Sequence, residues 1–184
     1  MTYLSFNGHK ILLLYFAVNL IFCFTEATCA TDVALIDPVR DNQLSASSQL
    51  NSNNRAAASR LNQPASWAAA NNQLGEYLQV DFEKDVVVKT IATQGGGGSC
   101  DAWVESYTLA YRFDGGMYSD VLDAKVRNVS VFKANTDCNT MIRRDLYPPV
   151  AARFVRIFPQ TWRTRIAMRW EIYGCNQAVG IPGE

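Results

Sequence analysis

The side chains that most often do chemistry in proteins are scarce in this sequence. Its one histidine, His9, lies near the N-terminus, so the rest of the chain has no imidazole for a general base, a catalytic triad or a histidine metal site. The 17 acidic residues are scattered, and no close pair stands out as a general acid and base. We therefore expect a protein that is not an enzyme.

The cysteines favour a structural role. Cys23 lies in an apolar N-terminal segment, which leaves four others, Cys29, Cys100, Cys138 and Cys175. No CxxC spacing points to a metal or redox site, and four cysteines allow three pairings. We favour the nested pairing, Cys29 with Cys175 and Cys100 with Cys138, because the first bond would bracket the domain. In the chain-entropy model that closure contributes about 5 kcal/mol.

The N-terminal segment has the pattern of a secretion signal. Residues 11–24 are apolar except for Asn19, and this run is shorter than the roughly 20 residues that span a bilayer. Small residues allow cleavage after Ala27 or after Ala30, and we favour Ala27 because the later site would remove Cys29. We expect a secreted, extracellular protein with a signal peptide over residues 1–27, a domain over 28–175 and a flexible tail over 176–184.

Charge excludes one class of partner and leaves another open. Lysine and arginine number 17, equal to the acids, so nothing indicates nucleic-acid binding. Arginines are dense between residues 143 and 169, however, where they would form a basic patch for sulfated glycan or anionic lipid. The alternative that we favour is that they flank strands and pair with acids such as Asp81, Asp85 and Glu171.

The elements that must position these residues are β-strands. Residues 76–82 alternate polar and apolar side chains, which is typical of a half-buried strand. The glycine run at 95–98 lacks the Lys-Ser/Thr of a phosphate loop and predicts a flexible tip held by Cys100. A polar turn containing Trp162 would separate the last two strands. No helical period is sustained, so about eight strands predict an all-β sandwich or barrel, over residues 44–48, 76–82, 85–94, 104–113, 118–121, 128–133, 152–158 and 166–173.

Two further features concern modification and ions. Asn128, Val129 and Ser130 form an N-glycosylation sequon, which suits a secreted protein. No cofactor is expected. A structural calcium ion held by loop acids such as Asp114 or Asp120 is left open, although no EF-hand spacing supports it.

Eight fragments in order carry a family resemblance: LSASSQ, SRLN, GEYLQVDF, IATQG, WVESYTLAYRFDGG, NTD, PPVAARFVRIFPQTW and IAMRWEIYGC. Together they resemble the discoidin domain, also called the coagulation factor V/VIII type C domain, from Cys29 to Cys175. The resemblance implies a jellyroll-like, galactose-binding-like β-sandwich of about eight main strands, with the first and last cysteines bridged. The TQG sequence followed by Cys100, Asp101 and Trp103 is similar to a loop of retinoschisin, another secreted member of this family.

The resemblance also implies where ligand would bind. Family members use loops at one end of the sandwich, here residues 49–55, 68–74 and 95–103, with 135–139 beside them. Their side chains are mostly amides, with one arginine and a nearby aromatic ring, which suits sugar hydroxyls. The residues that we expect in these ligand-binding loops are Gln49, Leu50, Asn51, Asn53, Asn54, Arg55, Asn71, Asn72, Gly97, Ser99 and Trp103.

These loop tips decide between two ligand classes. Coagulation-factor domains insert bulky apolar tips into membranes, whereas Leu50 is the one such side chain expected here and would supply at most about 2–3 kcal/mol. We therefore expect a lectin-like module that recognises cell-surface or extracellular-matrix glycan or glycoprotein and supports cell adhesion. The alternative is a peripheral binder of anionic phospholipid membranes, whose binding should weaken with salt. We expect the four tryptophans to pack in the core, with Trp103 the best candidate for a ligand platform.

Overall fold

The computed structural model of the protein describes residues 5–6, 9–10, 29 and 31–176. Most of the expected signal peptide, its cleavage sites and the tail beyond residue 176 lie outside these residues. The short strands β1 (Ser5–Phe6) and β2 (His9–Lys10) pair with one another in antiparallel fashion. Within the described residues, no helix has the length and apolar character needed to cross a bilayer.

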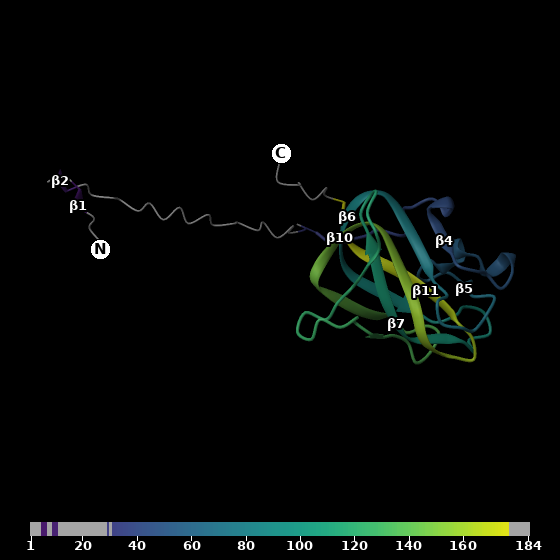
Figure 1. Ribbon diagram of the computed structural model, residues 1–184. Helices are drawn as coiled ribbons and strands as arrows, with labels where there is room; N and C mark the ends of the chain where they lie inside the picture. Colours follow the sequence, from purple (N-terminus) through teal and green to yellow (C-terminus); the bar gives the residue numbers. More distant parts are fainter. Residues whose placement is uncertain (1–4, 7–8, 11–28, 30, 177–184) are drawn as a thin grey trace.

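The body of the chain is a network of antiparallel strands (Figure 1). The main path of the sheet runs β3-β11-β6-β10-β7-β8, with β4 added to β6, β5 to β11 and β9 to β7. The strands are β3 (Val33–Ala34), β4 (Leu44–Ala46), β5 (Trp67–Ala68), β6 (Leu78–Gln94), β7 (Trp103–Arg112), β8 (Ser119–Asp120), β9 (Phe132–Lys133), β10 (Ile142–Arg163) and β11 (Ala167–Cys175). Three short 3-10 helices, η1 (Asp41–Gln43), η2 (Ser52–Asn54) and η3 (Ala56–Ser59), precede β5.

Two long strands, β6 and β10, belong to both layers of the sandwich. The first part of β6 pairs with the β10 segment at 154–157, and its later part pairs with residues 142–152 and with β11. The register shifts between these parts, and Glu83 has a positive φ of 61° there. Irregularities of this kind let a strand bend from one sheet into the other. The expected strands at 76–82 and 85–94 are therefore two parts of one bent strand.

The end of the chain differs from the expectation in two ways. The strand expected at 152–158 is only the middle of β10, which begins at Ile142 and ends at Arg163. Pro148 and Pro149 lie where the register shifts between Asp145 and Val150. Residues there have no paired partner in β6, so the missing N–H groups of the prolines remove no hydrogen bond between β10 and β6. The prediction that Trp162 lies in a turn was wrong, because it pairs with Val104 and the chain turns at Thr164–Arg165 instead.

The core lies between the layers. The expected alternation in β6 is confirmed, because Leu78, Val80 and Phe82 are buried while the residues between them are partly exposed. Trp67 and Trp170 are fully buried at its centre. The all-β sandwich predicted from the pattern of strands is confirmed.

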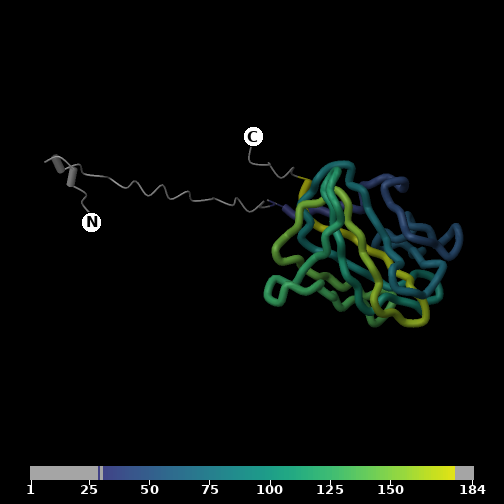
Figure 2. The backbone as a smooth tube through the Cα atoms, in the orientation of Figure 1, coloured from purple at the N-terminus to yellow at the C-terminus, as the bar shows by residue number. Residues whose placement is uncertain are grey.

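Both disulfides of the nested pairing are present. Cys29 bonds Cys175 across 146 residues, and Cys100 bonds Cys138 across 38. The first bond joins the beginning and end of the domain, which lie side by side in Figure 2. Strand β3 also pairs with β11 close to this bond, so hydrogen bonds and a covalent link close the sandwich at the same place.

Candidate functional site

Four stretches of chain meet at one end of the sandwich and enclose a cavity of about 260 Å³, which we call the loop-end pocket. They come from the segment around η2, the approach to β5, the β6–β7 loop and the β10–β11 turn. Glycines in the β6–β7 loop allow close packing, since a Cβ on Gly97 would lie 2.1 Å from the carbonyl oxygen of Pro64. The pocket is lined by Leu50, Asn54, Ser66, Ala68, Gly96, Gly97, Ser99, Asp101, Ala102, Thr164, Arg165 and Ala167.

Four of the expected ligand-loop residues line this pocket: Leu50, Asn54, Gly97 and Ser99. Their chemistry is mixed, because Leu50 contributes an apolar side chain, which is 40% exposed, whereas Asn54 contributes a polar amide. The Nδ2 of Asn54 donates to the carbonyl oxygen of Ser66 at 3.0 Å, which joins two of the loops. The Oγ of Ser99 donates to Asp101 Oδ1 at 2.9 Å, so the hydroxyl and the carboxylate are held next to each other.

Two other expected residues line a different cavity. Gln49 and Arg55 border a neighbouring space of about 390 Å³ between β4, η1 and η3. Arg55 is held there by Asp41, with Nη2 at 3.2 Å from Oδ2. Arg55 and Asn54 therefore border different cavities.

The remaining expected residues lie outside the pocket. Asn51 accepts a hydrogen bond from the backbone N–H of Asn53 and caps η2. Asn71 is exposed. Asn72 holds the β10–β11 turn, because its Nδ2 donates to Thr164 O at 3.0 Å and its Oδ1 accepts from Ile166 N at 2.9 Å.

Trp103 does not line the pocket either. It begins β7, where it pairs with Arg163, and its side chain is half-buried. Its indole Nε1 is buried and has no partner in the described part of the chain. The structure thus presents Trp103 as packing beneath the β6–β7 loop rather than as an open aromatic platform.

Part of the pocket wall was not predicted from the sequence. Asp101 lay in an expected loop but was not singled out, and Ser66, Thr164 and Arg165 lay outside all the expected loops. The signal for the last two was the polar interruption between the final two β-rich runs, which contains both residues but was predicted as a turn and not as a ligand-binding loop. Arg165 consequently takes the place in the pocket that Arg55 was expected to have.

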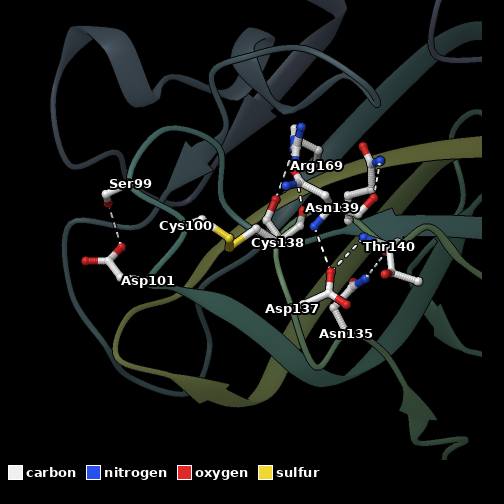
Figure 3. The surroundings of a disulfide bond; sticks show 11 residues. Ser99, Cys100, Asp101, Asn135, Asp137, Cys138, Asn139, Thr140 and Arg169 are labelled. Carbon is white, nitrogen blue, oxygen red and sulfur yellow. Dashed lines mark hydrogen bonds between the residues drawn. A yellow bond between two sulfur atoms is a disulfide. The ribbon is translucent and has the colours of Figure 1, made fainter.

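A buried arginine lies beneath these loops (Figure 3). Arg169, in β11, is 5% exposed and donates to three backbone carbonyl oxygens, those of Gly95 at 3.0 Å, Gln63 at 2.7 Å and Cys138 at 2.6 Å. Burial lowers the pKa of its guanidinium from the ordinary value. One side chain thus joins the segment before β5, the β6–β7 loop and the Cys138 turn.

The Cys100–Cys138 bond adds a second link between the β6–β7 loop and the Cys138 turn. That turn is ordered by Asp137, whose Oδ1 accepts from the backbone N–H groups of Asn139 at 2.8 Å and Thr140 at 2.7 Å. These hydrogen bonds hold the pKa of Asp137 below its ordinary value. The expected fourth loop therefore supports the pocket from below and does not line it.

The arginines of the last third of the chain are mostly engaged. Arg153 Nε lies 2.8 Å from Asp81 Oδ1, as the favoured interpretation expected, and Arg156 stacks between the rings of Tyr77 and Tyr118. The expected pairs with Asp85 and Glu171 do not appear among the ion pairs of the described residues.

Glu171 instead orders the start of the domain. Its carboxylate accepts the backbone N–H groups of Ile36 at 2.6 Å and Asp37 at 3.0 Å. Burial raises the pKa of Glu171, and these hydrogen bonds oppose that shift only in part. Its partners are thus backbone groups rather than arginines.

The two acids named for a calcium ion have different surroundings. Asp114 accepts a hydrogen bond from Arg153 at 2.9 Å, and Asp120 lies exposed in β8. In the part of the chain that the structure describes, no three His, Cys, Asp or Glu side chains gather to hold a metal ion.

Comparisons with known proteins agree with this architecture. Coagulation factor VIII of Canis lupus familiaris is 34% identical over 145 residues, which is 75% of this chain and 6% of that protein. The structure of discoidin II from Dictyostelium discoideum superposes with a TM-score of 0.69 at 25% identity, covering 80% of this chain and 60% of the other. A family 32 CBM from Clostridium perfringens NanJ, solved in complex with galactose, shares the fold at a TM-score of 0.57 and 14% identity, covering 78% of this chain and 99% of that chain.

The family itself follows from the sequence match. The chain spans only a small part of factor VIII and less than two thirds of discoidin II. The model of the F5/8 type C domain nevertheless matches residues 43–172, from the residue before β4 into β11. This range includes the four stretches that enclose the loop-end pocket, and the chain belongs to the F5/8 type C, or discoidin, domain family.

Proposed function

We propose that this chain is a secreted, non-catalytic recognition module that binds the terminal sugar of a cell-surface or matrix glycan in the loop-end pocket. The observation that carries the proposal is the polar wall of that pocket. An amide from Asn54, a hydroxyl from Ser99, a carboxylate from Asp101 and a guanidinium from Arg165 surround one small cavity. This mixture of donors and acceptors suits neighbouring sugar hydroxyls, each of which both donates and accepts.

The size of the pocket limits the size of the ligand that it can hold. Its volume of about 260 Å³ is below the range of about 300–1,000 Å³ that holds drug-sized molecules, so it fits one sugar ring rather than a long oligosaccharide. A ring of roughly 12 heavy atoms at about −0.3 kcal/mol per atom gives about −4 kcal/mol, or a Kd of about 1 mM. Adhesion would then need several sites on one surface. The galactose in the complex of the clostridial module makes galactose the first sugar to test.

A glycan array followed by titration of the full chain tests this proposal. Arg165→Ala should lose the sugar hit because it removes a pocket donor. Arg55→Ala is the matched control, since Arg55 borders the other cavity, and it should bind as the wild type does. Equal binding by both variants, or equal loss in both, would show that the sugar binds elsewhere.

Exposed leucines favour a second candidate, an anionic phospholipid surface. Leu50 is 40% exposed and Leu74, on the neighbouring loop, is 66% exposed. Their exposed parts together amount to about one leucine side chain, so insertion would contribute about 1.5–3 kcal/mol, with about 1 kcal/mol more from Arg165 near the headgroups. Flotation with phosphatidylserine vesicles that decreases steeply with salt and is lost in Leu74→Ser would favour this candidate; sugar binding should be insensitive to salt.

A further inference from the structure

The loop between β8 and β9 exposes apolar side chains that the loop-end pocket does not use. Leu122 is 45% exposed, Val126 66%, Val129 42% and Val131 63%. Single exposed apolar residues need no explanation, whereas contiguous ones mark a surface that something covers. Four such residues within ten positions of one loop therefore require a reason.

These side chains lie on one short loop. Leu122 and Val129 face each other in an antiparallel bridge, and Val126 lies in the turn between them. Leu122 also lines a cavity of about 310 Å³ together with Tyr147, which is 75% exposed. We call the four exposed apolar side chains of the loop, Leu122, Val126, Val129 and Val131, the 122–131 surface.

Asn128 lies in the middle of this loop with an exposed side chain. The hydrogen bonds that order the turn are made by Asp123, whose N–H donates to the carbonyl oxygen of Asn128 at 2.8 Å and whose Oδ1 accepts from Lys125 N and Val126 N. Within the described residues, the side-chain amide of Asn128 makes no hydrogen bond. The first residue of the sequon is therefore accessible and unengaged, and Ser130 supplies the required hydroxyl.

We propose that Asn128 carries an N-linked glycan whose first sugars cover the 122–131 surface. The proposal rests on passage through the secretory route, which the proposed function also requires. In the reaction, Asn128 Nδ2 forms a bond to the anomeric carbon of an oligosaccharide held on a lipid diphosphate. The bond from that carbon to the diphosphate oxygen breaks, the diphosphate leaves with the electron pair, and the amide loses one proton.

The chemistry of a glycan suits this position. The C–H faces of the first sugars would pack on Val126 and Val129, while their hydroxyls remain in water. The structure also leaves room for the glycan, because Asn128 and its flanking turn point away from the core. A second copy of the chain is the competing occupant, and it would leave the sequon at the centre of an interface.

Occupancy is tested by expressing the full chain in cultured animal cells. The wild type should migrate more slowly than the chain treated with peptide N-glycosidase. Asn128→Gln and Ser130→Ala should both abolish this shift, whereas Ser130→Thr, which preserves the sequon, should retain it. A wild-type chain that shows no shift would overturn the proposal.

Whether the glycan covers the apolar side chains is tested on folded protein before and after enzymatic removal of the glycan. Binding of an apolar fluorescent dye should rise on removal, and Val126→Ser with Val131→Ser should prevent the rise. Dye binding that is unchanged by removal would refute the covering role. A glycosylated dimer that dissociates in the double serine variant would assign the surface to a second copy instead. Neither measurement involves sugar binding in the loop-end pocket, so failure of the glycan proposal can be distinguished from failure of sugar binding there.

Discussion

Replacing Arg169 by methionine would test whether one buried side chain holds the loops of the pocket together. The arginine donates to three backbone carbonyl oxygens on three separate segments and is 5% exposed. Methionine fills much of the same volume but offers no donor. The change therefore isolates the loss of these hydrogen bonds from the loss of packing.

The magnitude follows from two opposing effects. Each buried carbonyl left without a partner costs about 1–3 kcal/mol, whereas removing a buried charge recovers part of its desolvation penalty. We expect Arg169→Met to lower the free energy of unfolding by about 3 kcal/mol. For a domain of this size, that corresponds to a decrease in Tm of about 6–12 °C.

The assay is thermal and urea unfolding with both disulfides intact. Arg169→Lys should also be destabilised, because a compact ammonium cannot reach three carbonyl groups that lie in different directions. Arg163→Met, at an exposed position, is the control and should change stability by less than about 0.5 kcal/mol. If Arg169→Met unfolds within about 1 kcal/mol of the wild type, the three loops do not depend on this residue and the reasoning fails.

Three further predictions concern the pocket, the disulfide and pH. Gly97→Ala should abolish ligand binding, because its Cβ would lie 2.1 Å from a carbonyl oxygen of the neighbouring loop; Gly98→Ala, with φ of 79° but open space around its Cβ, should lose about 1–2 kcal/mol in unfolding and still bind. Replacing both Cys100 and Cys138 by serine opens a loop of 38 residues and should cost about 4 kcal/mol by the chain-entropy model, measured by urea unfolding; a loss under about 1 kcal/mol would contradict that model here. Burial disfavours the carboxylate of Asp81, but hydrogen bonds from its arginine partner and from the backbone hold its pKa below the ordinary 3.8. Its stabilising contribution should therefore be present above about pH 4 and be lost as the pH falls through the folded-state pKa, and Asp81→Asn should flatten this part of a stability–pH curve; an unchanged curve would show that other acids control it.

The strands could be predicted because their pattern is local. Alternation in residues 76–82 reports which side chains face the core, and burial of Leu78 and Val80 follows directly from it. Strand lengths were less predictable, since β10 continues through Pro148 and Pro149 only because a register shift falls there. That shift depends on β6, more than 50 residues earlier in the chain.

The candidate site was predictable only in part for the same reason. Asn54, Gly97 and Ser99 lie in loops that the family resemblance had indicated, and they do line the pocket. Arg55 was chosen with them as a guanidinium donor for sugar hydroxyls, yet it pairs with Asp41 and borders a separate cavity.

By itself, the sequence determined the all-β class, the four cysteines and the family, because alternation, composition and ordered motifs can all be read along the chain. Only the tertiary structure decided that Arg165 and Asp101 share one pocket and that Arg169 joins three loops beneath it. The physical reason is that β11 pairs with β6, which lies far from it in sequence. Packing against β6 brings together residues that are separated by more than 60 positions in sequence, and no local pattern records that convergence.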